Sequence, residues 1–155
     1  MNIQERIEAL ETEFNEKIKA LKAEVQQEDE FPQVEDDYWY VLGDAEVIFT
    51  VWYGDDYDKG RLSIGNVFKT KEQAEFVVEK LKVEAELRKF SRPFKEDDYN
   101  SFIELYMFDK TLTVDSNEYW QTQGVIYFES DEKAQQAIDT VGEERIKKYV
   151  FGVEE

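Results

Sequence analysis

The sequence predicts an α+β fold: a long N-terminal helix followed by a duplicated β-β-α unit whose copies form one antiparallel sheet with helices packed on it. Three observations predict it. Apolar residues recur at helical spacing in the first 27 residues, β-rich runs come in pairs, and one strand-to-helix junction occurs twice, 60 residues apart. The expected domains are a helix at 1–27, an acidic linker at 28–37 and an α+β domain at 38–155, divided into units of about 38–95 and 96–155.

The first helix carries one apolar stripe whose members are separated by steps of 4, 3, 4, 4, 3 and 4: Ile3, Ile7, Leu10, Phe14, Ile18, Leu21 and Val25. This eleven-residue repeat over three turns predicts a helix that stays straight or winds slightly right-handed. A helix of this length is marginal with its stripe uncovered. Either its own domain or the same helix of a second chain must cover it, and we expect a homodimer.

The first β-β-α unit begins with β-rich runs at 38–42 and 46–53, which predict a hairpin around Gly43-Asp44. A third strand is expected at 61–68 and a helix at about 71–90. That helix has two apolar faces, of which one is expected to lie on the sheet. The other is expected to meet the N-terminal helix of this chain or of its twin, through Phe76, Val83, Leu87 and Phe90.

The second unit repeats this plan with strands at 101–108, 111–114 and 119–128, a polar turn at 115–117, and a helix after Ser130. With an offset of 60 residues, the repeated junction aligns four pairs: Phe68 with Phe128, Thr70 with Ser130, Glu72 with Glu132, and Ala74 with Ala134. Gly142 is expected to end or kink this helix, before a short helical turn or strand at 145–151.

The charge is strongly acidic, with 19 Lys and Arg against 37 Asp and Glu and a net charge of −18. Residues 28–60 hold eleven acidic side chains and one basic side chain, Lys59. Such a chain is repelled by nucleic acid and by anionic membranes, and it is attracted to basic grooves. The expected partner is therefore a protein with a basic groove, without direct binding to nucleic acid or membrane.

Several classes of chemistry lack their usual residues. The chain has no cysteine and no histidine, so thiol nucleophiles, imidazole bases and the commonest zinc ligands are absent, and we expect a non-enzymatic protein without metal or cofactor. The run 55–60 resembles the start of a calcium loop, but Tyr57 and Lys59 stand where acids or amides are required, and Asn66 stands where a glutamate is required. The absence of cysteine, of a signal peptide and of a long apolar run favours a cytoplasmic location.

Acidic and aromatic residues cluster in three places, at 35–40, 52–58 and 96–99. One interpretation is structural, since aromatic residues fill sheets and Asp and Gly form turns. The functional interpretation is a contact surface in which carboxylates face a basic partner and tyrosines fill its pockets. The candidate contact residues are Asp36, Asp37, Tyr38, Asp55, Asp56, Tyr57, Asp58, Glu96, Asp97 and Asp98.

Three strings, YWYV (38–41), GNVFKTKEQAEFVVEKLKVEAELRKF (65–90) and VIYFESDEKAQQAIDTVGEERIKKYVFGV (125–153), together resemble small acidic proteins encoded by phages and prophages of low-GC Gram-positive bacteria. The resemblance covers residues 38–153, about three quarters of the chain. It implies a role in the host cytosol; some phage proteins of this kind are anti-CRISPR inhibitors that occupy the basic grooves of Cas9-type effectors.

The first functional hypothesis is therefore a phage-derived inhibitor that binds a host nucleic-acid-handling protein, such as a CRISPR effector. The alternative is a phage structural or assembly protein that oligomerises through its N-terminal helix. A third hypothesis, a carboxylate-based metal-dependent hydrolase, predicts stabilisation by divalent cations.

Overall fold

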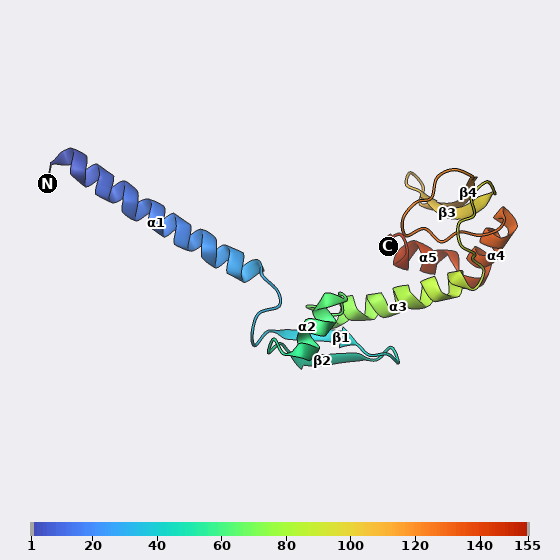
Figure 1. Cartoon of the computed structure of the whole chain (residues 1–155), viewed down its shortest axis with the longest axis horizontal. Coiled ribbons are helices and arrows are strands. Elements are labelled where there is room, and N and C mark those ends of the chain that lie inside the picture. The colour runs from blue at the N-terminus through green and yellow to red at the C-terminus, as the bar shows by residue number, and fades with distance from the viewer. Residues whose placement is uncertain (1, 155) are drawn as a thin grey trace. The chain divides into compact units, whose positions relative to one another are not determined.

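The computed structural model describes residues 2–154, the side chains of 26–29 excepted (Figure 1). The chain divides into two compact units. The first contains the residues up to Lys71 apart from the turn at 43–46; the second contains that turn and the residues from Glu72 onward. The predicted α+β class and long N-terminal helix are confirmed. The prediction of one shared sheet is wrong, because the four strands form two separate two-stranded sheets.

Helix α1 spans Ile3–Asp29 and begins with a capping box that the sequence analysis had not identified. The Asn2 side-chain oxygen accepts the Glu5 backbone N–H at 2.8 Å, and a Glu5 carboxylate oxygen accepts the Asn2 N–H at 2.8 Å. Both donors are backbone N–H groups at the start of the helix, where no preceding turn provides a carbonyl acceptor. The capping box therefore satisfies two groups that would otherwise lack a partner. Six of the seven stripe residues are exposed, by 45% to 77%, and Ile18 is half-buried.

The first unit contains the predicted hairpin, formed by β1 (Asp37–Val41) and β2 (Val47–Val51) with Trp39 opposite Phe49. The third strand predicted at 61–68 is wrong: helix α2, Asp56–Ser63, covers its first three positions, and of the other described positions in that range only Phe68 pairs, with Trp39. Asp55 caps this helix by accepting the Asp58 backbone N–H at 2.8 Å. Acidic residues in its first turn suit the helix dipole. After it, Gly65 takes a φ of +73°, which a regular strand does not adopt.

The second unit contains the predicted second hairpin, formed by β3 (Asn100–Tyr106) and β4 (Thr111–Asn117), and the helices α3 (Lys71–Arg88), α4 (Asp131–Val141) and α5 (Glu143–Tyr149). The polar turn predicted at 115–117 lies inside β4. The strand predicted at 119–128 is absent from this described segment; only Phe128 pairs, with Ser101.

The core of the second unit brings α3, α4 and α5 together around Phe128. Its buried members are Val83, Leu87, Phe128, Ala134, Ala137, Ile138, Val141 and Ile146. Gly142 separates α4 from α5 with a φ of +103°, which favours glycine. A two-pronged ion pair joins α3 to α5, because Arg145 Nη1 and Nη2 each lie 2.9 Å from a carboxylate oxygen of Glu86.

The predicted duplication is visible at the strand-to-helix junction. Phe68 exchanges two backbone hydrogen bonds with Trp39 of β1, both at 2.9 Å. Phe128 exchanges two with Ser101 of β3, at 2.8 and 3.0 Å. A helix begins three residues after each phenylalanine. The repeat therefore describes a hairpin, a single bridging residue and a helix, instead of three strands and a helix.

Candidate protein-binding surface

The first unit contains a buried carboxylate, Asp58, on the inner side of α2. Its Oδ1 atom accepts the Tyr38 hydroxyl at 2.6 Å, and its Oδ2 atom accepts the backbone N–H groups of Tyr53 and Gly54 at 2.8 and 2.9 Å. Arg61 Nη1 donates to the Tyr38 hydroxyl oxygen at 2.8 Å and lies 3.7 Å from Asp58 Oδ1. We call Tyr38, Asp58 and Arg61 the Asp58 cluster.

The bonds of this cluster set the charge state of Asp58. Burial alone raises the pKa of the carboxyl group, but the hydrogen bonds from Tyr38 and from the backbone of Tyr53 and Gly54 outweigh it, and the pKa lies below its ordinary value. Burial and the Asp58 carboxylate raise the pKa of Tyr38. A charged Asp58 and a neutral Tyr38 are thus the stable pair near neutral pH.

The Asp58 cluster fixes the loop that joins β2 to α2. The Arg61 guanidinium also lies over the Tyr40 ring, 3.7 Å from its centre, and the Tyr38 ring packs edge-on against Trp52. Because Asp58 holds two successive backbone N–H groups of the loop, Tyr53 and its neighbours are held against β1. The loop is therefore pre-organised before any partner arrives.

Two of the three predicted acidic clusters meet at this end of the hairpin. The Glu35 N–H donates to the Trp52 carbonyl at 2.8 Å, and the Trp52 N–H donates to the Asp36 carbonyl at 2.8 Å. Asp37 lies opposite Val51 in the sheet. The segment before β1 and the segment after β2 therefore run side by side at this end of the hairpin. We call the exposed acidic and tyrosine side chains here the acidic end: Glu35, Asp37, Tyr53, Asp56 and Tyr57.

The acidic end has features of a contact surface. Tyr53 is 68% exposed and Tyr57 is 77% exposed, an unusual position for large rings. Among the residues that the structure describes, the side chains of Glu35, Asp37 and Asp56 make no hydrogen bond or ion pair. Their charges are thus open to solvent or to a cationic partner.

The other predicted contact residues of this unit have structural roles. Tyr38 and Asp58 are buried and belong to the Asp58 cluster, so neither is available to a partner. An Asp36 carboxylate oxygen accepts the Gln33 backbone N–H at 2.7 Å, and Asp55 caps α2. Each of these carboxylates accepts a hydrogen bond from a backbone N–H group of a residue close to it in the sequence, and a short acidic side chain reaches such a group easily. These carboxylates therefore stabilise the fold.

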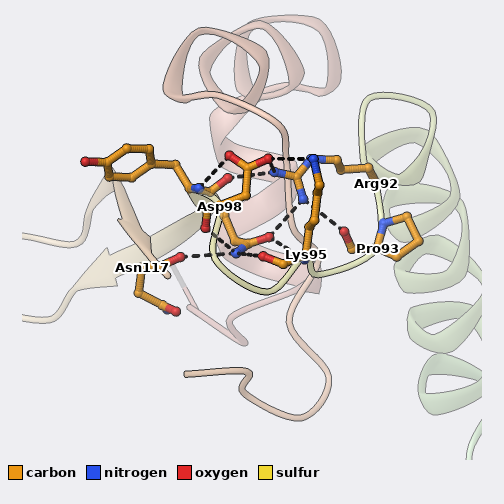
Figure 2. A network of polar contacts seen from close by, with 7 residues as sticks. Arg92, Pro93, Lys95, Asp98 and Asn117 are labelled. Carbon is orange, nitrogen blue, oxygen red and sulfur yellow. Dashed lines mark hydrogen bonds and ion pairs between the residues drawn. The ribbon is translucent and has the colours of Figure 1, made fainter. Parts of the chain in front are cut away.

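The third predicted cluster, Glu96, Asp97 and Asp98, lies in the second unit before β3. Glu96 and Asp97 are exposed, whereas Asp98 lies 3.0 Å from Lys95 Nζ and 3.9 Å from Arg92 Nη2 (Figure 2). A hydrogen bond from Lys95 is the main reason that the pKa of Asp98 is lowered. Asp98 is therefore largely neutralised within its own unit.

The loop around this third cluster is held by Asn100, which is fully buried. Its Oδ1 accepts Arg92 Nη1 and the Lys95 N–H, each at 2.8 Å, and its Nδ2 donates to the carbonyls of Lys95, Asp98 and Asn117 (Figure 2). Asn100 thus forms hydrogen bonds with backbone groups of the loop before β3 and of the last residue of β4.

Asn100→Ala is expected to lower the free energy of unfolding of the second unit by about 2–3 kcal/mol, because it leaves several buried polar groups unpaired. Thr113→Ala on the exposed face of β4 is the matched control, with an expected change of about 0.5 kcal/mol. Hydrogen exchange of the backbone amides of β3 and β4 measures both, because it reports on opening of the second unit alone. Equal losses for the two variants would contradict the role assigned to Asn100.

Three exposed aromatic residues lie at the same end of the second hairpin; Tyr99 belongs to the third predicted cluster, and the other two were not predicted from the sequence. Tyr99 precedes β3, and Tyr119 and Trp120 follow β4; they are 63%, 76% and 75% exposed. Tyr119 and Trp120 were assigned to a strand because aromatic residues favour strands, although the following Gln-Thr-Gln-Gly run is loop-like. Corresponding ends of the two hairpins therefore both carry exposed carboxylates and aromatic rings.

The predicted dimerisation residues fall into two groups. Those of α1 are exposed or half-exposed, as described above. On α3, Phe76 is 37% exposed and packs against Tyr149, whereas Val83 and Leu87 are buried in the core of their own unit and Phe90 packs against that core. Val83, Leu87 and Phe90 are thus occupied by α4, α5 and Phe128, because the second unit builds its core on that face of α3.

Comparison with known proteins yields no protein-family model, no curated protein and no solved structure that matches this chain. Within residues 2–154, no group of three or more Asp or Glu side chains is arranged to hold a metal ion. In the same residues, no helix has the length and apolarity needed to cross a membrane.

Proposed function

We propose that this chain is a non-enzymatic, phage-derived inhibitor that binds a host nucleic-acid-handling protein in the host cytosol through the acidic end. One observation carries the proposal: three carboxylates without side-chain partners in the described structure and two exposed tyrosines lie at one end of the hairpin, beside a loop fixed by the buried Asp58 cluster. Carboxylates that need no internal partner and rigid aromatic rings are the components of a protein-binding surface.

The charge distribution indicates what kind of partner fits. Residues 28–60 have a net charge of −10, from one basic and eleven acidic side chains. Such a surface is attracted by clusters of Arg and Lys, and the strongest natural clusters of this kind line grooves that bind nucleic acid. A protein seated there excludes the nucleic acid, so binding by itself inhibits. The resemblance to phage proteins supports the host setting and a target such as a Cas9-type effector.

The proposal is tested by capture from a nuclease-treated lysate of a phage-susceptible host, with elution by a salt gradient and identification by mass spectrometry. We expect recovery of a nucleic-acid-binding enzyme that elutes as salt rises, because ionic contacts are screened. Recovery of virion components alone would reject the inhibitor in favour of the alternative below. Recovery of neither would reject a high-affinity host target in that lysate.

The alternative is a phage assembly protein, and the observation that favours it is the exposed apolar stripe of α1. An assembly protein predicts large ordered oligomers whose formation is indifferent to the acidic end. In either case we propose that α1 associates with α1 of a second copy, as the spacing of its apolar residues predicts.

A further inference from the structure

We infer that two copies of α1 pair in an antiparallel arrangement centred on Phe14. The inference rests on the self-association proposed above and adds its direction and register. It does not depend on the acidic end or on the identity of any host target.

The apolar spacing of α1 is the first reason. The steps of 4, 3, 4, 4, 3 and 4 read the same from either end, with Phe14 at the middle. When two such helices run in opposite directions and cross at Phe14, every stripe residue meets another stripe residue at the same level. The matched pairs are Ile3 with Val25, Ile7 with Leu21, Leu10 with Ile18, and Phe14 with its own copy.

The exposure of this face is the second reason. Ile3 is 77% exposed, and Leu10 and Phe14 are 65% and 64% exposed. A 27-residue helix has little stability in water without burial of its apolar face. The second copy is the occupant that we infer, since its stripe has the same palindromic spacing and matches this one along its whole length.

The charge of α1 selects the direction. Residues 3–13 contain four acidic and one basic side chain, a net charge of −3, whereas residues 15–25 contain two acidic and three basic side chains, a net charge of +1. Antiparallel pairing places the acidic half of each helix beside the basic half of the other. Parallel pairing would place acidic beside acidic and basic beside basic.

The individual flanking residues agree with this direction. At about 3.67 residues per turn, Arg6, Glu13, Lys17 and Glu24 border one side of the stripe, and Gln4, Glu11, Asn15 and Lys22 border the other. In an antiparallel pair, each border of one helix faces the same border of the second helix. On the charged border the cross-helix pairs join opposite charges, Arg6 with Glu24 and Glu13 with Lys17, and the other border brings no like charges to the same level.

A parallel pair makes less favourable contacts along these borders. There each border faces the other border of the second helix, so Glu13 approaches Glu11 of the second copy, whereas Glu24 approaches Lys22. The repulsive contact offsets the attractive one, so the borders favour the antiparallel arrangement, in which both pairs join opposite charges.

Distance measurement between spin labels distinguishes the two directions. The full-length chain contains no cysteine, so Gln4→Cys and Asn15→Cys each give one label per copy, on the same border of the stripe. Antiparallel pairing separates the two labels along the helix axis by about 30 Å at position 4 and about 3 Å at position 15, from a rise of 1.5 Å per residue. Equal distances at the two positions would show parallel pairing and overturn the inference.

Sedimentation velocity on the same proteins provides the stoichiometry. A dimer is expected, and either a monomer at the concentration of the distance measurement or an oligomer larger than two would also overturn the inference. Only the monomer would remove the self-association proposed above, so the two ideas can fail separately. Binding to a captured host protein is scored in a different experiment and is unaffected by either result.

A matched pair of charge variants tests the register. Glu24→Lys places a lysine opposite Arg6 of the second copy and is expected to weaken dimerisation about tenfold, whereas Glu16→Lys makes the same change on the outer face and leaves it unchanged. The double variant Arg6→Glu, Glu24→Lys restores opposite charges and is expected to recover wild-type dimerisation. Equal effects of the two single variants, or failure of the double variant to recover, would contradict the proposed pairs.

Discussion

Replacing Asp58 by alanine is expected to lower the free energy of unfolding of the first unit by about 3–5 kcal/mol, because it removes one member of a buried charged pair. The Tyr38 hydroxyl and the N–H groups of Tyr53 and Gly54 lose their acceptor, and Arg61 loses its carboxylate neighbour. Urea denaturation followed by the fluorescence of Trp39 and Trp52, in a Trp120→Phe background, measures the loss.

Asp56→Ala is the matched control for this prediction. Asp56 is the same residue type in the same helix, but it is exposed, so its replacement costs only its interaction with the helix dipole, about 0.3–1 kcal/mol. If the two variants lose the same stability, the Asp58 cluster does not hold the first unit together.

The pH dependence of stability provides a second readout of the same carboxylate. The pKa of Asp58 is lower in the folded protein than its ordinary value of 3.8, so the folded state binds fewer protons in this range. The stabilisation is fully present above the ordinary value and is lost as pH falls through the lowered folded pKa. Asp58→Ala is expected to reduce this acid-dependent loss, whereas Asp56→Ala leaves it in place.

Reversal of three charges at the acidic end has the largest expected effect on binding. The variant Glu35→Lys, Asp37→Lys, Asp56→Lys is expected to weaken binding to a basic partner at least about hundredfold, from roughly 1 kcal/mol for each lost contact. The reversed residues have exposed side chains outside the Asp58 cluster. The free energy of unfolding should therefore change by only about 1 kcal/mol.

A second triple variant separates the site from the overall charge. Glu104→Lys, Asp115→Lys, Glu129→Lys changes the net charge by the same amount, at exposed positions that belong to the second unit and not to the acidic end. It is expected to retain most of the affinity. Equal weakening by both triple variants would mean that net charge alone drives binding, without a defined surface.

The sequence predicted the regular elements well where the pattern was local. Both hairpins, the helices near 71 and 131 and the Ser130 cap follow from alternation, turn residues and capping, which depend on neighbouring residues. The repeat of Phe68 and Phe128 also has a local cause, since each bridges to a strand immediately before a helix.

The failures occurred where distant contacts decide the structure. Helix α2 contains Gly60 and has little intrinsic stability; Tyr38, twenty residues earlier in the chain, fixes it through Asp58. Tyr38 and Asp58 were predicted to contact a partner, but they are buried because they bond to each other. The acidic clusters could be recognised from composition, but the role of each carboxylate depends on which backbone N–H groups the fold brings within reach.

The most direct test of the acidic end is the dissociation constant of the captured host protein for the wild-type chain and for the Glu35, Asp37, Asp56 triple variant, measured over a range of salt concentrations. We predict that the wild-type constant rises steeply with salt, and that the variant binds at least about hundredfold more weakly with a shallower dependence. Equal dissociation constants for the two proteins, or a wild-type constant independent of salt, would contradict binding through this surface.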